Sequence, residues 1–511
     1  MTDSKPLDLV IIGGGINGAG IAADASGRGL AVALYEMNDL ASATSSASTK
    51  LIHGGLRYLE NYEFALVRKS LQEREVLLAK APHIIRPLAL RLPHRQFLRP
   101  KWMIRLGLFL YDFLGKRVTL PRSRKISFSQ DGPLQASFKD GFEYYDAKVD
   151  DSRLVILNAR QAQDNGAAIH TRMECVSAIA TGGVWELVFL NHLTGQQSKI
   201  HARAVVNATG PWVSQLLSGS FSQADTHQIT LVKGCHIIVP NLYSSSEAYF
   251  LQNDDGRVVF VIPYAQDFTL IGTTEVNFQG DPASAVISDQ EVDYLIDVVN
   301  THFKKTLTKQ DVVHHFAGVR PLVGAENGEN TKSAVAGKIS RDYRLHLNID
   351  EAPLVSVYGG KITTYRLLAE QTMALLKPFF TQMTDDWTEQ AALPGGDFSD
   401  VTSLRVKMIA DYPWMPAKIL ERWLESYGSL IPQLINTAQA VADFGVHFGH
   451  GLYQQEVDYL KECEWALTPE DILWRRSKLG LIFSSRECKN LQDYLQQGLQ
   501  YSNDNRLHQT A

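Results

Sequence analysis

The chain has 511 residues, of which 45% are hydrophobic and 21% charged, which indicates a folded protein of about two to four domains and excludes a disordered chain. Its net charge of -5 argues against binding nucleic acid through a broad basic surface, and its four widely spaced cysteines argue against a disulfide framework. We expect no signal peptide, transmembrane helix or metal site, because the sequence lacks a secretory pattern, a long apolar run and a zinc-like spacing of histidine and cysteine.

The first forty residues predict a dinucleotide-binding unit. A buried strand over residues 8–12 is followed by a G-x-G-x-x-G pattern, a helix rich in small residues and a second strand over 31–35. Gly13 permits a tight turn, Gly15 lets the backbone approach a pyrophosphate, and Gly18 lets helix and strand touch. Glu36 follows Gly13 by 23 positions and is expected to accept hydrogen bonds from ribose hydroxyls, which disfavours NADP.

A run of small hydroxyl residues over 43–50 precedes a histidine and a glycine pair at 53–55. Such a run suits close passage of the backbone along a cofactor. The alternative interpretation is a flexible loop.

Residues 95–125 form a basic amphipathic segment in an otherwise acidic chain. They hold nine basic residues and one acidic residue, a net charge of +8, interleaved with tryptophan, phenylalanine and leucine. This pattern is typical of an interfacial helix that lies on anionic lipid. The alternative is a core helix flanked by solvated charges.

Further strand signals recur far downstream and favour FAD over NAD. A strand near residue 205 ends at Gly210, and a strand over 354–358 ends at Gly359-Gly360-Lys361, followed by a helix over 362–376. A nucleotide domain interrupted twice in this way is typical of FAD-dependent oxidoreductases. The N-terminus of the last helix would stabilise the negative charge of a reduced flavin, and Thr363 and Thr364 either contact the cofactor or cap that helix.

A linker over 391–397 precedes a mostly helical C-terminal region, for which we expect a cap domain. A homodimer contact through its tryptophans and plain packing explain this region equally well.

The sequence resembles the family of aerobic, FAD-dependent glycerol-3-phosphate dehydrogenases of bacteria. The resemblance runs along nearly the whole chain in these blocks: Ile11–Gly20, Thr44–Glu60, Phe142–Arg153, Val205–Trp212, Val232–Pro240, Gly272–Glu275, Gly318–Leu322, Arg341–Tyr343, Ser356–Arg366 and Asp471–Lys478. It implies an α/β fold (α+β overall) with a Rossmann-like FAD-binding domain interrupted by a mixed-sheet substrate domain, plus a C-terminal helical cap domain. The domains expected are FAD-binding, 1–80, 145–230 and 340–388; substrate, 81–144 and 231–339; and cap, 389–511.

The resemblance, together with the motifs, also supplies the residues expected to contact FAD. They are Gly13, Gly14, Gly15, Asn17, Gly18, Glu36, Thr44, Ser45, Ser46, Lys50, Leu51, His53, Gly210, Gly360, Lys361 and Thr363. Lys50 and His53 are interpreted as residues of the cofactor loop and not as catalysts.

The implied reaction converts glycerol 3-phosphate to dihydroxyacetone phosphate, with hydride transfer to FAD and electrons passed to a membrane quinone. Arg320 is the first candidate for binding the phosphate, followed by Arg341 and Arg57; the alternative for each is an ordinary surface ion pair. His236 is the candidate general base, against the alternative of a core histidine. Lys361 would stabilise a developing alkoxide, and Arg57 completes the catalytic candidates.

A quinone acceptor implies a peripheral protein on the cytoplasmic face of the inner membrane, without a transmembrane helix. Three other functions remain open from the sequence. They are a soluble glycerophosphate oxidase that reduces oxygen, an amino-acid or amine oxidase of similar fold, and a flavin-binding membrane protein without turnover.

Overall fold

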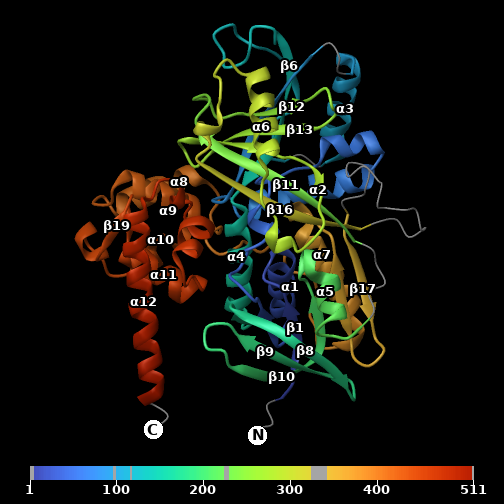
Figure 1. Cartoon of the computed structure of the whole chain (residues 1–511), viewed down its shortest axis with the longest axis vertical. Coiled ribbons are helices and arrows are strands. Elements are labelled where there is room, and N and C mark those ends of the chain that lie inside the picture. Colours follow the sequence, from blue (N-terminus) through green and yellow to red (C-terminus); the bar gives the residue numbers. More distant parts are fainter. Residues whose placement is uncertain (1–4, 96–98, 116–117, 224–228, 324–341, 509–511) are drawn as a thin grey trace. The chain divides into compact units, whose positions relative to one another are not determined.

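The computed structural model describes residues 5–95, 99–115, 118–223, 229–323 and 342–508. The chain divides into two compact units, one of Met1–Lys80 and Ile85–Ala391, the other of Ala81–Ile84 and Ala392–Ala511 (Figure 1). The sequence placed the cap boundary at 389 and kept 81–84 in the substrate domain. The short segment joins the second unit because the ring of His83 packs against that of Phe398, with centroids 6.3 Å apart.

The first unit contains an eight-stranded sheet that carries the nucleotide-binding motif. Its central strand, β1, pairs in parallel with β2 and β10, and β10 pairs in parallel with β18. The strands, in sheet order, are β17 (Arg344–Asn348), β18 (Leu354–Tyr358), β10 (Gln197–Asn207), β1 (Leu7–Ile12), β2 (Val32–Tyr35) and β7 (Ala168–His170), with β8 (Met173–Thr181) and β9 (Val184–Asn191) attached through β10. The strands predicted over 8–12 and 354–358 are thereby confirmed.

One face of this sheet is covered by α1 (Ile16–Gly27), which packs between α4 (Asp151–Asp164) and α7 (Tyr365–Leu376). Small residues on α1 make this close packing possible: a Cβ atom on Gly20 would come within 2.6 Å of the Tyr365 ring. The opposite face packs against β8 and β9, whose Trp185 and Phe189 are buried. Both faces are therefore apolar, as expected for a parallel sheet.

The first unit also holds a ten-stranded mixed sheet. Its strands, in sheet order, are β15 (Val276–Asn277), β11 (Ile229–Pro240), β14 (Phe268–Gly272), β13 (Val258–Tyr264), β12 (Ala248–Gln252), β4 (Ile85–Pro93), β6 (Asp140–Val149) and β3 (Leu51–Ile52), with β16 (His314–Val323) beside β11 and β5 (Arg124–Ser127) beside β6. The expected boundary at residue 145 falls inside β6, and β3 comes from the segment expected in the FAD-binding domain. Both differences arise because β3 pairs with the end of β6.

Side chains on β11 alternate between two faces of this mixed sheet. Ile237 and Val239 pack with Leu295 and Val299 of α6 (Asp289–His302), a helix that begins at a Ser288 capping box. Gly234 and His236 therefore lie on the opposite face. The other α-helices in the described part of this unit are α2 (Phe64–Lys80), α3 (Lys101–Leu114) and α5 (Val213–Ser218).

The second unit is helical around a core that includes Trp423. The buried carboxylate of Glu456 accepts hydrogen bonds from the Arg422 guanidinium, the Trp423 indole and the Tyr427 hydroxyl, which fixes α9 against α11. Its elements are α8 (Val401–Asp411), α9 (Ala417–Ser426), α10 (Ile431–Ile435), β19 (His447–Gly449), β20 (Leu452–Tyr453), α11 (Gln454–Glu464), a π-helical stretch (Asp471–Arg476) and α12 (Ser485–His508).

Candidate active site

The glycine turn after β1 admits no side chain at its two most confined positions. Gly13 has φ +112°, and a Cβ atom there would lie 2.6 Å from the Ala208 carbonyl oxygen. A Cβ atom on Gly18 would lie 1.9 Å from the carbonyl oxygen of Gly13. The N-terminus of α1 is thereby held at the end of β1, where its N–H groups and positive dipole end suit a pyrophosphate.

Two side chains brace this turn. The carboxylate of Glu36 accepts the N–H of Gly14 at 2.7 Å and the N–H of Asn38 at 2.8 Å, and burial raises the pKa of this carboxyl. Ser45 Oγ accepts the N–H of Ile16 at 3.0 Å. The hydroxyl run over 43–50 is therefore seated on the nucleotide turn instead of being a flexible loop.

The same run continues along the second sheet. The Thr44 hydroxyl donates to the carbonyl of Val319 at 2.7 Å, and the Ser46 hydroxyl donates to Ala43 within its own turn. Leu51 is buried in β3. The run thus connects the nucleotide turn to the strand that carries Arg320.

The segment after β18 closes the site from the other side. Asn17 Nδ2 donates to the carbonyl of Gly359 at 3.2 Å, and Gly360 has φ +110°. Thr363 Oγ1 accepts the N–H of His53 at 3.3 Å, while no side chain caps the helices that begin here. Thr364 occupies the N-cap position of α7, as one alternative expected, but its side chain makes no capping hydrogen bond. The predicted helix over 362–376 begins as a 3-10 turn, Ile362–Thr364, and becomes α-helical at Tyr365.

These residues fit a bound FAD. Asn17 Oδ1 is buried, and within the described part of the chain it has no hydrogen-bond partner. It lies among the N-terminus of α1, the seated hydroxyl run and the Gly359-Gly360 turn. Gly210, with φ +58°, adds a turn at the end of β10 with open space on its Cβ side. An orphaned polar atom within such a cradle is expected of a cofactor site.

The side chain of Lys50 has its partners within the protein. Its ammonium group is buried, donating to Asp151 Oδ1 at 2.7 Å and to the carbonyl of Ser46 at 2.9 Å. The Ser48 hydroxyl donates to the other oxygen of the same carboxylate at 2.7 Å. Asp151 at the start of α4 thus supplies the buried partner that this charge requires, and a contact of Lys50 with the cofactor stays a prediction.

His236, on β11, lies between strands β14 and β16. Its neighbours are Gly272 on β14 and Phe316 on β16. The imidazole stacks on the Phe316 ring, with ring centroids 4.9 Å apart. A Cβ atom on Gly272 would lie 2.1 Å from the imidazole, so the ring fits only because residue 272 is glycine. Its Nε2 lies 3.0 Å from the Thr49 hydroxyl. Burial and the positive charges of Arg320 and Lys50 lower the pKa of His236 well below its ordinary value, so the ring is neutral at neutral pH.

Arg320 lies on the same side of the site as His236, on β16 opposite Val232 of β11. One guanidinium nitrogen is 3.6 Å from the carboxylate of Glu275, and another would touch a Cβ atom on Gly234 at 3.1 Å. Arg320 thus forms an ion pair, and its side chain is 24% exposed, so the guanidinium is not fully enclosed. It can therefore meet an anionic ligand.

The other basic residues predicted for the site are Lys361, Arg57 and Arg341. Lys361 Nζ lies 3.8 Å from the centroid of the Tyr58 ring, so an aromatic face supports this ammonium group. Arg57 donates to the carbonyl of Gly256 at 2.8 Å, in the turn between β12 and β13. Arg341 lies outside the described residues.

Sequence reasoning missed Thr49, Tyr58, Asp151 and Phe316 as parts of this site. Thr49 was part of the hydroxyl run, but its partner is 187 positions away, and no local pattern connects the two. Phe316 could have been found from the pairing of β11 with β16, since cross-strand partners share a face.

Comparisons with known proteins identify the family of the chain. A model of the FAD dependent oxidoreductase family matches residues 8–366, and a model of the C-terminal domain of alpha-glycerophosphate oxidase matches residues 387–505. The glycerol-3-phosphate dehydrogenase of Pseudomonas aeruginosa is 53% identical over 502 residues, which is 97% of each chain. This chain belongs to the glycerol-3-phosphate dehydrogenase family. The resemblance, the α/β fold and FAD as cofactor are thereby confirmed.

Members of the glycerol-3-phosphate dehydrogenase family differ in the substrate they are named for. The D-erythritol 1-phosphate dehydrogenase of Brucella abortus is 47% identical, covering 95% of this chain and 97% of that one. Among solved structures, the glycerol-3-phosphate dehydrogenase of Bacillus halodurans complexed with FAD superimposes with a TM-score of 0.72 and 26% identity, covering 97% and 94%. The family likeness thus extends through both units of the chain.

Proposed function

We propose that the chain oxidises sn-glycerol 3-phosphate to dihydroxyacetone phosphate and passes the electrons to a membrane quinone. The observation that carries the proposal is the placement of Arg320 and His236 on one face of β11 and β16, beside the hydroxyl run that reaches the nucleotide turn. Bound FAD supplies the hydride acceptor. Arg320 binds the phosphate, Lys361 stabilises the developing negative charge on oxygen, and His236 accepts a proton.

The length of β11 between these groups matches a short phosphorylated polyol. The guanidinium of Arg320 lies beside Gly234 of β11, and His236 lies two residues further along the same face of this strand. Two residues of a strand span about 7 Å, which suits a phosphate at one level and a reacting hydroxyl at the other. D-erythritol 1-phosphate, after which a relative at 47% identity is named, is the informative competitor.

The first experiment adds each compound to the purified holoenzyme without oxygen and follows the visible flavin absorption. We expect glycerol 3-phosphate to bleach the flavin at a lower concentration than D-erythritol 1-phosphate. Preferential bleaching by the erythritol compound would reassign the substrate. A flavin that stays oxidised with both would contradict the proposal and favour an amino acid or amine as substrate.

The electron acceptor is tested on the reduced enzyme. A short-chain quinone is expected to reoxidise the flavin faster than dissolved oxygen does. Stoichiometric hydrogen peroxide with no preference for quinone would instead identify a glycerophosphate oxidase.

Contact with a lipid surface is supported by α3. None of the described helices is both long enough and apolar enough to cross a bilayer. The inner side of α3 is fixed, because the Tyr111 hydroxyl accepts the N–H of Gly54 at 2.8 Å and donates to Asp146 at 2.7 Å. Four large apolar side chains, at i, i+4, i+7 and i+11 on its outer side, are exposed: Trp102 by 65%, Leu106 by 49%, Phe109 by 60% and Phe113 by 78%. Such a stripe suits a helix lying in a membrane interface.

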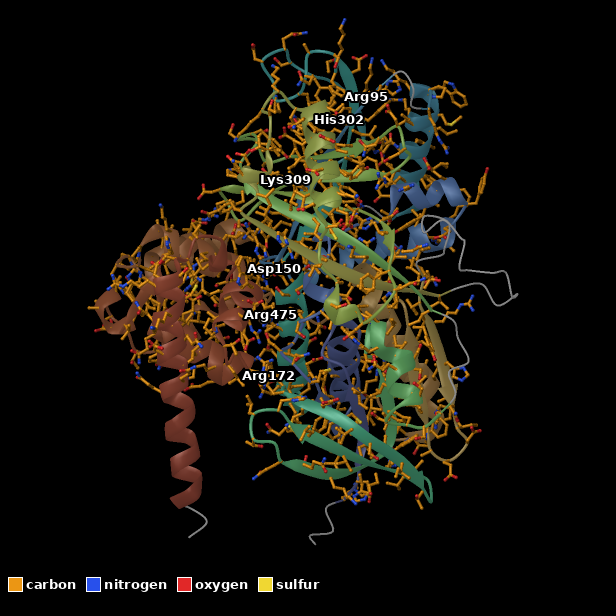
Figure 2. The ribbon with its side chains drawn as sticks, viewed as in Figure 1. Arg95, Asp150, Arg172, His302, Lys309 and Arg475 are labelled. Carbon is orange, nitrogen blue, oxygen red and sulfur yellow. The ribbon has the colours of Figure 1, made fainter. Side chains whose placement is uncertain are left out.

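The basic residues around α3 contribute less to attraction by anionic lipid than their net charge of +8 implies. Acidic residues from elsewhere pair with several of them: Glu60 with Arg99, Asp140 with Lys101, and Glu143 with Arg124. Arg95 lies over the Phe138 ring at 4.9 Å, and Figure 2 shows it near His302. We therefore expect the apolar stripe to outweigh basic charge in holding the protein to the cytoplasmic face of the inner membrane.

Replacing Trp102, Phe109 and Phe113 with serine is expected to lower binding to anionic vesicles by more than 100-fold, because each buried aromatic contributes about 2 kcal/mol. Neutralising Arg99, Lys101 and Arg105 together should lower it less. Vesicle flotation measures both. Replacing exposed Val406 and Ile409 of α8 with serine is the matched control. Equal binding of the aromatic variant and the wild type would remove α3 as the contact.

A further inference from the structure

The imidazole of His236 is enclosed by the described residues. Its side chain is completely buried, one face stacks on Phe316, and its Cδ2 edge fills the space above Gly272. Nδ1 is also buried, and no described residue hydrogen-bonds to it. Nε2 points at the hydroxyl of Thr49 at 3.0 Å. A substrate that enters the site therefore meets the Thr49 hydroxyl before it meets His236.

Thr49 is suited to lie between substrate and base. It is partly exposed, unlike His236, and it belongs to the run that Ser45 seats on the N-terminus of α1. The run cannot swing away from His236, because buried Lys50 and Ser48 next to it are both bound to Asp151. The positive charges of Arg320 and Lys50 act on His236, which places the phosphate-binding candidate within electrostatic reach of the same ring.

From this arrangement we infer that Thr49 receives the hydroxyl proton of the substrate and passes its own proton to His236. The inference rests on the function proposed above. As the C2–H bond breaks and its electron pair leaves with the hydrogen for the flavin, the C2 hydroxyl proton moves to Thr49 Oγ1. The Thr49 proton moves to Nε2 of His236. The products are a ketone, reduced cofactor, an unchanged threonine and an imidazolium, so atoms and electrons balance.

The relay requires one tautomer of His236. Nε2 must be an acceptor before the reaction, so the proton of the neutral ring must be on Nδ1. The opposite tautomer would donate to Thr49 and could not take its proton. The lowered pKa of His236 keeps the ring neutral before the substrate binds, and a phosphate dianion on Arg320 would offset one of the two positive charges that lower this pKa. Thr49 is then a catalytic residue, and His236 acts through it.

Thr49→Val removes the hydroxyl while keeping the shape of the side chain, and Thr49→Ser keeps the hydroxyl. We expect Thr49→Val to slow anaerobic flavin reduction by glycerol 3-phosphate by roughly 100-fold, the lower end of general acid–base contributions. Thr49→Ser should stay within a few-fold of the wild type, and the pH dependence of reduction should flatten only in the valine variant. Thr372→Val, which removes a buried hydroxyl on α7 outside the site, is the matched control.

A second readout does not depend on turnover. Nitrogen-15 NMR of histidine-labelled protein, with His236 assigned through His236→Asn, should show Nε2 unprotonated and its shift altered by Thr49→Val. A protonated Nε2 in the wild type, or a valine variant reduced within threefold of the wild-type rate, overturns the relay. Failure of glycerol 3-phosphate to reduce the wild type overturns the proposed function instead, and is recognised before any variant is compared.

Discussion

Replacing Gly18 with alanine is expected to yield a protein that retains no FAD. The new Cβ atom would lie 1.9 Å from the carbonyl oxygen of Gly13. This oxygen belongs to the backbone, so no rotation of a side chain can relieve the clash. Helix α1 must therefore move away from β1, and its N-terminus leaves the pyrophosphate position. The cost of such overpacking is at least about 1–3 kcal/mol. Flavin content per chain after gel filtration measures the loss.

Two further glycine variants separate cofactor loss from unfolding. Gly107→Ala adds a Cβ atom with no neighbour within 4 Å, so it should keep its FAD and unfold no earlier than the wild type. Gly15→Ala brings its Cβ atom 3.1 Å from Ser45 Oγ, a milder contact, and should fold with weakened FAD affinity. Full flavin content in Gly18→Ala would show that α1 does not need this close approach.

Arg320→Ala is expected to raise the KM for glycerol 3-phosphate by roughly 100-fold while FAD stays bound. A charge-assisted contact to a phosphate dianion is lost, which corresponds to about 2–3 kcal/mol. The carboxylate of Glu275, 3.6 Å away in the wild type, would then face the phosphate without its neighbouring cation. Steady-state kinetics and flavin content are measured on the same preparation.

The controls for this variant use other arginines. Arg203→Ala removes a guanidinium that pairs with Asp8 at 2.9 Å on the first sheet, and should leave the KM unchanged. Arg320→Lys keeps the charge but loses the planar guanidinium, so its KM should lie between those of Arg320→Ala and Arg203→Ala. An unchanged KM in Arg320→Ala would remove Arg320 from the phosphate site and direct attention to Arg57.

Local patterns predicted the nucleotide half of the site well. The strand over 8–12, the glycine turn and Glu36 lie within about thirty residues, so one short stretch of sequence contains the whole motif even though β10 and Ala208 complete its packing. The strand over 354–358 and its glycine pair were equally readable, because a buried parallel strand is a continuous apolar run.

The contacts that sequence patterns did not supply involve side chains whose partners are distant in sequence. Lys50 was expected at the cofactor, yet its charge is satisfied by Asp151, 101 positions away. The net charge counted over residues 95–125 could not include Glu60, Asp140 and Glu143, which reach that surface from other elements. Pattern and composition show which charged side chains a segment contains. Ion pairs with residues distant in sequence decide which of these side chains can still bind a ligand or a lipid surface.

The order of strands in the first sheet also has a consequence for biosynthesis. β1 is made first, but its neighbour β10 begins only at Gln197, and Asn17 bonds to Gly359, 342 positions later. At ~5–20 residues per second, a ribosome needs roughly 20–70 s to make the chain between them. Until β10 is complete at Asn207, the central strand has an unpaired edge, which exposes it to mispairing. The turn at Gly359 and Gly360 is made only after about seven-tenths of the chain, so we expect FAD to find its complete cradle late in synthesis.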